Sequence, residues 1–152
     1  MKWVTRARPK IDRIACPWLI ARFIDKEPEF LYVAPDKVLS VAAETGATPF
    51  DIPGVELSHE DGLCSFDTFL KRYQLTDPAL HQMALMVRGA DTAHFDLAPQ
   101  AAGLFAVSLG LSALFADDHE MLQHGMVVYD ALYAWSRGQQ GETHTWPPVM
   151  TA

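Results

Sequence analysis

The pattern of apolar residues changes at Ser65, and this change most limits how the chain can fold. Before Ser65, short segments with strand and helix spacing alternate, and after it every apolar segment repeats with helical spacing. No linker or internal repeat divides the 152 residues, which are the size of one ordinary domain. We therefore expect a single α+β domain over residues 1–152, with a small N-terminal sheet and two helices followed by a cluster of about four helices.

Local residue preferences place the elements of this fold. Pro17 suits the first position of a helix, Gly46 suits a helix end, and Ser65 and Asp77 suit helix caps. Strands are predicted at 2–5, 29–33 and 48–52. Helices are predicted at 17–25, 36–45, 66–73, 78–89, 99–115 and 117–137. The tail 139–152 is expected to be loose at its end.

Charge and cysteine content exclude several classes of protein. The net charge of −7 argues against general nucleic-acid binding, although residues 1–26 hold seven of the twelve Lys and Arg residues. This basic segment is either an anion-binding segment or a solvated surface that pairs with the acidic body. The two cysteines form no Cys-x-x-Cys, which argues against a disulfide framework and a thiolate zinc site.

Membrane and export signals are weak. The first residues, MKWVTRARPK, lack the apolar stretch of a secretory signal. The most apolar later segment, 101–115, is shorter than a bilayer span. The expectation is a soluble cytoplasmic protein without membrane contact.

Residues 117–125, DDHEMLQHG, concentrate metal-ligand side chains on a predicted helix. Glu120 and His124 lie one turn apart on one face, a spacing that can hold zinc, iron or manganese. Their partners would be His59 and Asp91, each predicted in a loop. The alternative is that the acidic residues only stabilise the first turn of a helix, where exposed N–H groups favour negative charge.

Cys16 precedes Pro17 and is therefore predicted at the start of a helix. A thiol at that position, near Arg13, has a lowered pKa and is a candidate nucleophile. The alternative is a small buried apolar residue, which is the commoner role of a free cysteine.

Four long segments together resemble the C-terminal domain family of the chromate-resistance protein ChrB. The resemblance rests on these sequences: WVTRARPKIDRIACPWLIARFID, PFDIPGVELSHEDGLCSFDTFL, ALMVRGADT and LSALFADDHEMLQHGMVVYDALYAW. It implies a role in chromate resistance, where the family's regulator responds to chromate, and it assigns no chemical role to a residue. Because it covers the segments of all the candidate ligands, it favours a ligand site over a simple helix cap.

The leading interpretation is a sensor or accessory domain that binds a divalent metal (Zn, Fe or Mn) and a small oxyanion such as chromate or sulfate. The metal ligands would be His59, Asp91, Glu120 and His124. The donors to the oxyanion would be Arg6, Arg8, Arg13 and Arg88. The first alternative is a small enzyme that uses the metal or Cys16 on a thiol or an oxyanion. The second is a ligand-free dimerisation module, as a homodimer built on the helical half.

Overall fold

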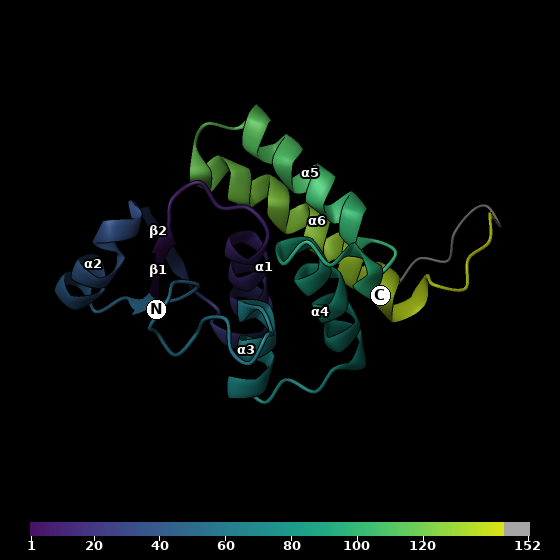
Figure 1. Cartoon of the computed structure of the whole chain (residues 1–152), viewed down its shortest axis with the longest axis horizontal. Coiled ribbons are helices and arrows are strands. Elements are labelled where there is room, and N and C mark those ends of the chain that lie inside the picture. The colour runs from purple at the N-terminus through teal and green to yellow at the C-terminus, as the bar shows by residue number, and fades with distance from the viewer. Residues whose placement is uncertain (145–152) are drawn as a thin grey trace.

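The computed structural model describes residues 1–144, and the part of the predicted loose tail at 145–152 lies outside the described residues. A small parallel sheet and one helix occupy one end of the molecule, and the longer helices occupy the other (Figure 1). This is the predicted α+β arrangement. The strands are β1 (Lys2–Arg6), β2 (Glu29–Val33) and β3 (Thr48–Pro49). The α-helices are α1 (Asp12–Leu19), α2 (Val38–Thr45), α3 (Ser65–Arg72), α4 (Pro78–Asp91), α5 (Ala101–Leu114) and α6 (Asp118–Gly138).

The sheet has the order β2-β1-β3, and all its strands are parallel. The central strand β1 is buried at Trp3 and Val4, as expected for a parallel strand covered on both faces. Strand β2 has the predicted bounds, whereas β3 is shorter than predicted. Beyond β3, the N–H of Phe50 still donates to the carbonyl of Val4 at 3.0 Å, so the chain leaves the sheet beside the carboxyl end of β1.

Helix α1 begins at Asp12, and the prediction that a helix begins at Pro17 is wrong. Pro17 lies inside the helix, where it lacks the N–H that would pair with the carbonyl of Arg13. The hydroxyl of Tyr32 in β2 donates to that carbonyl at 2.8 Å instead. The helix then widens into a π-helical turn at Ile20–Ile24. A long-range contact thus makes an internal proline tolerable, which local preference alone does not reveal.

The predicted helices of the second half are confirmed, with small shifts at their ends. The Asp77 carboxylate caps α4 by accepting from the N–H of Ala79 at 2.9 Å. The Asp117 carboxylate caps α6 by accepting from the N–H of Glu120 at 2.9 Å. Helix α3 begins at Ser65 with Cys64 as its cap residue, one position earlier than predicted.

Helix α1 lies at the centre of the core, in contact with α3, α4 and α6. Its Ile14 and Trp18 are fully buried, and α6 crosses it closely at Gly125, where a Cβ atom would lie 2.5 Å from Cγ2 of Ile14. This packing fixes the first turn of α1, and with it Asp12, between α3 and α4. Within residues 1–144 no helix is both long and apolar enough to cross a membrane.

Candidate metal and anion site

Four side chains from distant segments converge beside the first turn of α1. The Nε2 atom of His59 lies 3.0 Å from Oδ2 of Asp91, 3.3 Å from Oδ2 of Asp12 and 3.5 Å from Oδ1 of Asp51. A single ring N–H can point well at only one of these oxygens. The Nε2 atom of His59 therefore lies close to three carboxylates but can donate a good hydrogen bond to only one of them.

Asp12 is the most buried member of this cluster, at 1% exposure. Its carboxylate accepts from the N–H groups of Ser65 at 2.8 Å and Phe66 at 3.3 Å, the first two residues of α3. These are groups that a helix leaves without partners in its own backbone. Asp12 thus joins the start of α1 to the start of α3, which fixes the position of its carboxylate.

Asp51 follows β3 and connects the cluster to two arginines. Its backbone has a φ of 53°, a left-handed conformation that aspartate tolerates better than most residues. Its carboxylate accepts from the Ser65 hydroxyl at 2.7 Å and lies 3.4 Å from Nη2 of Arg6 and 3.6 Å from Nη1 of Arg13. Arg6 ends β1, so these groups gather at the carboxyl ends of parallel strands, where α/β proteins commonly bind ligands.

The proton affinities of the cluster follow from burial and mutual contact. Burial raises the pKa of Asp12 to about 7, against the lowering effect of its hydrogen bond with His59. Burial and the charge of Asp51 raise the pKa of Asp91. Burial opposes ionisation of Asp51, but hydrogen bonds from His59 and Ser65 and the nearby guanidinium groups hold its pKa below the ordinary value.

His59 has the opposite behaviour, because hydrogen bonds to Asp12 and Asp51 raise its pKa to about 10. The imidazole is consequently cationic at neutral pH while it faces the three carboxylates. The cluster stabilises positive charge at the position of the His59 proton. A metal ion would supply such a charge in place of that proton.

The ligand atoms of Asp12, His59 and Asp91 all lie within 4.8 Å of one another. One nitrogen and two carboxylate oxygens at this separation can bind one ion, and Asp51 lies beside them as a further oxygen donor. The donor set therefore fits a divalent transition metal. Its oxygen-rich composition suits manganese or iron as well as zinc.

Two of the four predicted metal ligands meet in this cluster, and two do not. His59 and Asp91 are 3.0 Å apart. Glu120 is exposed in the first turn of α6, and the ring of His124 stacks on Phe115 with 4.2 Å between ring centroids. The structure does not bring Glu120 or His124 into the group of ligand atoms around His59.

The four predicted anion-binding arginines also divide into two pairs. Arg6 and Arg13 flank Asp51 in the cluster. Arg8 instead pairs with Asp118 at 2.9 Å and donates to the carbonyls of Ser112, Phe115 and Ala116. Arg88 pairs with Asp67 at 3.1 Å. Arg8 and Arg88 thus have structural partners of their own, whereas Arg6 and Arg13 face the candidate site.

The predicted placement of Cys16 at the start of a helix is wrong. Cys16 is the fifth residue of α1 and is fully buried, with its Sγ 3.9 Å from Oδ1 of Asp12. Burial and the charge of Asp12 raise the pKa of its thiol well above the ordinary value. Since a nucleophilic cysteine needs a thiolate and access, the structure gives Cys16 the alternative role of a buried core residue.

The sequence interpretation missed Asp12 and Asp51 as candidate ligands. Asp12 lies on the same helix face as Ala15, Cys16 and Leu19, so it is an acidic residue on an apolar face. Asp51 follows an apolar strand, at the edge of the sheet where ligands commonly bind. Both features were present in the sequence. Recognising Asp12 required the correct start of α1, and recognising Asp51 required the parallel pairing of β3 with β1.

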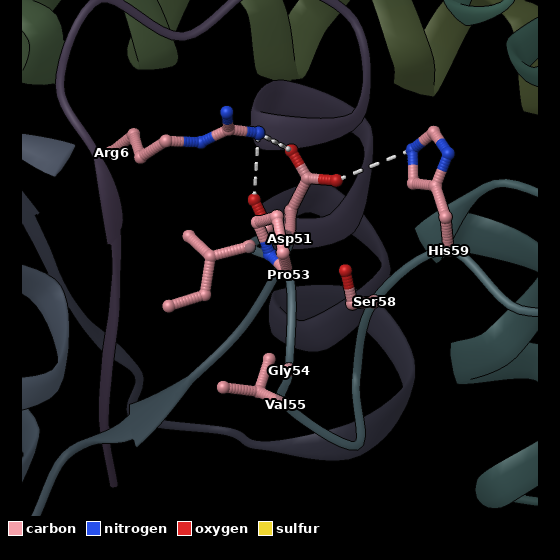
Figure 2. A pocket seen from close by; sticks show the side chains of 8 residues that line it. Arg6, Asp51, Pro53, Gly54, Val55, Ser58 and His59 are labelled. Carbon is pink, nitrogen blue, oxygen red and sulfur yellow. Dashed lines mark hydrogen bonds and ion pairs between the residues drawn. The ribbon is translucent and has the colours of Figure 1, made fainter.

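A cavity of about 400 Å³ opens beside the cluster (Figure 2). Arg6 lies on one side of the view and His59 on the other, with Asp51 between them. The other lining residues belong to the loop after β3: Ile52, Pro53, Gly54, Val55 and Ser58. The cavity therefore has a charged edge at the cluster and an apolar wall made by this loop.

Comparison with known proteins gives a match over most of the chain. Residues 3–136 match the family described as "ChrB, C-terminal domain". The chain is 31% identical over 138 residues to the protein named "Protein ChrB" from Cupriavidus metallidurans. This alignment covers 87% of the chain and 40% of that relative, so the chain spans less than half of the relative's length. No solved structure matches the chain.

Proposed function

The chain belongs to the ChrB C-terminal domain family, and from this premise we propose that it acts in chromate resistance as a metal-dependent oxyanion-binding domain. The observation that carries the proposal is the approach of Asp12, His59 and Asp91 within 4.8 Å of one another. These residues come from the start of α1, the loop before α3 and the end of α4. Titratable groups from three separate elements meet in one cluster, with ligand atoms close enough to share one ion, a juxtaposition typical of a binding site.

The metal in this proposal is zinc, iron or manganese, held by the His59 nitrogen and the carboxylates of Asp12 and Asp91. Asp51 is placed to be a fourth ligand or to orient a bound water. The bound ion would replace the proton of His59 and offset the repulsion among the buried carboxylates of Asp12 and Asp51 and the half-buried carboxylate of Asp91. We propose this set in place of the one that includes Glu120 and His124.

The oxyanion in this proposal, chromate or sulfate, approaches from the side of Arg6 and Arg13. The Nε atoms of both arginines are buried and find no hydrogen-bond partner among the described residues. Buried donors without partners are costly, and an anion that accepts from them would remove this cost. The two guanidinium groups therefore provide the anion-binding edge of a site whose other edge holds the metal.

A sensing role is proposed because the candidate metal ligands lie on different elements of the fold. A metal at this site would tie α1, α4 and the loop before α3 together, so its binding would change how firmly these elements are held. An enzyme remains the alternative, but it would rest on the metal cluster, because Cys16 is buried. Saturable anion binding without turnover separates the sensor from the enzyme.

A second candidate function is a dimerisation module, and one observation favours it. A groove of about 650 Å³ between α5 and α6 is lined by apolar side chains that include Val107, Leu111 and Val127, together with His124. Val107 is 47% exposed and Val127 is 65% exposed. Sedimentation of the purified chain would test this candidate, since a monomer at high concentration would exclude a stable homodimer.

The proposed function is tested by the metal content of the purified protein, measured after metal loading and removal of excess ion. The protein should retain stoichiometric zinc, iron or manganese. Loss of a residue that only supports a ligand already costs about 10–100-fold in metal affinity. The variant His59→Ala, which removes a ligand, should lose at least that much.

His124→Ala is the matched control, because it removes an imidazole that lies outside the cluster. It should bind metal like the parent protein. Equal metal content in the parent and both variants, or a loss confined to His124→Ala, would contradict the proposed site. Addition of chromate or sulfate to the loaded protein should then raise the unfolding temperature in a saturable way.

A further inference from the structure

The cavity beside the cluster is too large and too apolar on one side to be explained by a bare oxyanion. Its volume of about 400 Å³ lies in the range of roughly 300–1,000 Å³ that small organic ligands occupy in proteins. A tetrahedral oxyanion has only five heavy atoms and would leave most of this space to water. Ile52, Pro53 and Val55 form a wall with which an oxyanion gains no favourable contact.

The charge of the site favours an anion at the inner edge of this cavity. When a divalent ion is bound and His59 is neutral, three carboxylates are opposed by two guanidinium groups and the ion. The loaded site then has one excess positive charge. Arg6 lies on the cavity lining, with its Nη2 bound to the Asp51 carbonyl at 2.8 Å and its Nε without a partner among the described residues.

The backbone of the loop keeps the apolar wall in place. Its two ends are anchored, because the N–H of Asp51 donates to the carbonyl of Leu57 at 2.8 Å and the Thr68 hydroxyl donates to the carbonyl of Ser58 at 2.6 Å. The side chain of Ile52 is buried against the core of the sheet. Between these anchors, Gly54 adopts a φ of 86°, which turns the chain at the tip. The cavity is thus a formed feature with a fixed wall.

We propose that this cavity binds a small organic carboxylate, with its carboxylate on Arg6 beside the metal cluster and its carbon chain against Ile52, Pro53 and Val55. This inference deepens the proposed function, since the cavity shares Asp51 and His59 with the metal cluster. It names the class of ligand as a monoanionic organic acid. Chromate or sulfate would occupy only the charged edge.

The test is calorimetric titration of the manganese-loaded protein with acetate, butyrate and hexanoate, and with sulfate as the bare oxyanion. Each methylene that enters an apolar environment should raise affinity about threefold to fourfold. Hexanoate should therefore bind more tightly than butyrate, and butyrate more tightly than acetate. The variant Val55→Thr, nearly the same in shape but polar, should flatten this series while acetate binding stays as in the parent. Arg6→Gln should lose affinity for all three acids.

Arg22→Gln is the control for loss of an arginine, because Arg22 pairs with Asp130 away from the cavity. It should bind the acids like the parent protein. Sulfate binding as tight as that of hexanoate, with no effect of Val55→Thr, would overturn the inference and leave a bare oxyanion site. The absence of acid binding to a normally loaded protein would also overturn it, with the metal site intact.

Failure of the proposed function would be a different result, namely no retained metal. In that case the same acid series, titrated into the metal-free protein, still decides the inference, because Arg6 and the apolar wall remain and the proton of His59 supplies one of the two positive charges of the ion. A length dependence that Val55→Thr abolishes would support the cavity without the metal. No length dependence would overturn it.

Discussion

Two regions of the chain contain groups that can bind metal, and they differ in how those groups are distributed. Residues 117–125 place two aspartates, a glutamate and two histidines in nine consecutive positions. In the structure Asp117 caps a helix, Asp118 pairs with Arg8, the two histidine rings contact aromatic rings and Glu120 is exposed. Asp12, Asp51, His59 and Asp91 are spread over eighty positions and meet around one nitrogen. Ligand-type residues that are close together in the sequence need not meet in the structure, and residues far apart in the sequence can do so.

The difference has a physical cause. On one helix, side chains one turn apart share a face, but they point outward unless other elements cover that face. The start of α6 is exposed at Glu120 and His124, so its acidic residues act on the helix end itself. The cluster instead forms where three elements pack against the first turn of α1. Tertiary packing, which no local spacing encodes, brings its members together.

The largest expected effect is on the rate at which Cys16 reacts with an alkylating reagent. This rate tests whether a reagent can reach the cluster from the core, where Cys16 lies. Cys16 lies beneath Asp12 and is fully buried, and burial raises the pKa of both cysteines. Alkylation of either thiol should then require opening of the core, at a cost of about 5–15 kcal/mol. We expect native labelling to be slower than in unfolded protein by about 10³-fold or more.

Iodoacetamide labelling followed by mass spectrometry of the intact and unfolded protein measures this difference. Labelling of Cys16 at the rate of a free thiol in the native protein would show that the cluster opens toward α1. It would also restore the cysteine as a candidate nucleophile.

The close crossing of α1 and α6 should show the next largest effect. A Cβ atom added at Gly125 would meet Cγ2 of Ile14 at 2.5 Å, two residues from Asp12. Gly125→Ala should therefore cost about 1–3 kcal/mol of unfolding free energy through overpacking, less the gain of up to about 1 kcal/mol from the better helix propensity of alanine. Chemical denaturation measures the change.

Gly110→Ala in α5 is the matched control, because nothing lies within 4 Å of the added atom. It should stabilise the protein by about 0.5–1 kcal/mol. Equal stabilisation by both substitutions would show that α6 does not press on α1, and that the start of α6 has no part in placing Asp12.

The pH dependence of the metal-free protein should show a smaller effect, because solvent reaches His59 and screens its charge. Contact with Asp12 and Asp51 raises its pKa to about 10 from an ordinary value of 6.5. Between these two pH values the folded protein binds a proton at His59 that the unfolded chain has lost. This contribution to stability is complete below about pH 6.5 and disappears as the pH rises through 10.

Denaturation of the chelator-treated protein and of His59→Gln from pH 6.5 to 10 measures this contribution as the difference between the two. The stability of the parent should fall toward that of the variant as the pH rises. Metal-loaded protein should lack this fall, because the ion takes the place of the proton. A parent and a variant with parallel profiles would show that His59 does not join the carboxylates in solution.

Much of the fold was predictable because its signals are local. Gly46 ends α2 and Asp77 caps α4 through contacts within a few residues. The alternation at 29–33 indicates β2 by its own side-chain pattern, although the hydrogen bonds of this strand run to β1. The start of α1 was not predictable in this way. Pro17 lies inside this helix, and the Tyr32 hydroxyl, fifteen positions later in the chain, donates to the Arg13 carbonyl that Pro17 leaves without a donor.

The candidate site was predictable in part for the same reason. His59 and Asp91 stood out as polar residues beside apolar segments, whereas Asp12 was hidden by the assumption that the helix began at Pro17. Asp51 was hidden because its role depends on β3 pairing in parallel with β1. Each missed candidate ligand is therefore placed by contacts that are distant in the sequence, which the sequence pattern did not contain.

Removal of the helix cap of α6 should have the smallest effect on stability. It tests the comparison from the side of residues 117–125. The Asp117 carboxylate accepts from the N–H of Glu120, so Asp117→Ala should cost about 1 kcal/mol of unfolding free energy. Glu120→Gln, at an exposed position, should change stability by no more than about 0.5 kcal/mol. Neither variant should alter metal content, because both side chains lie outside the cluster around His59. Metal loss in Glu120→Gln, or in an Asp117→Ala protein that remains folded, would mean that the start of α6 supplies a ligand to the ion after all, and the two regions would then form one site.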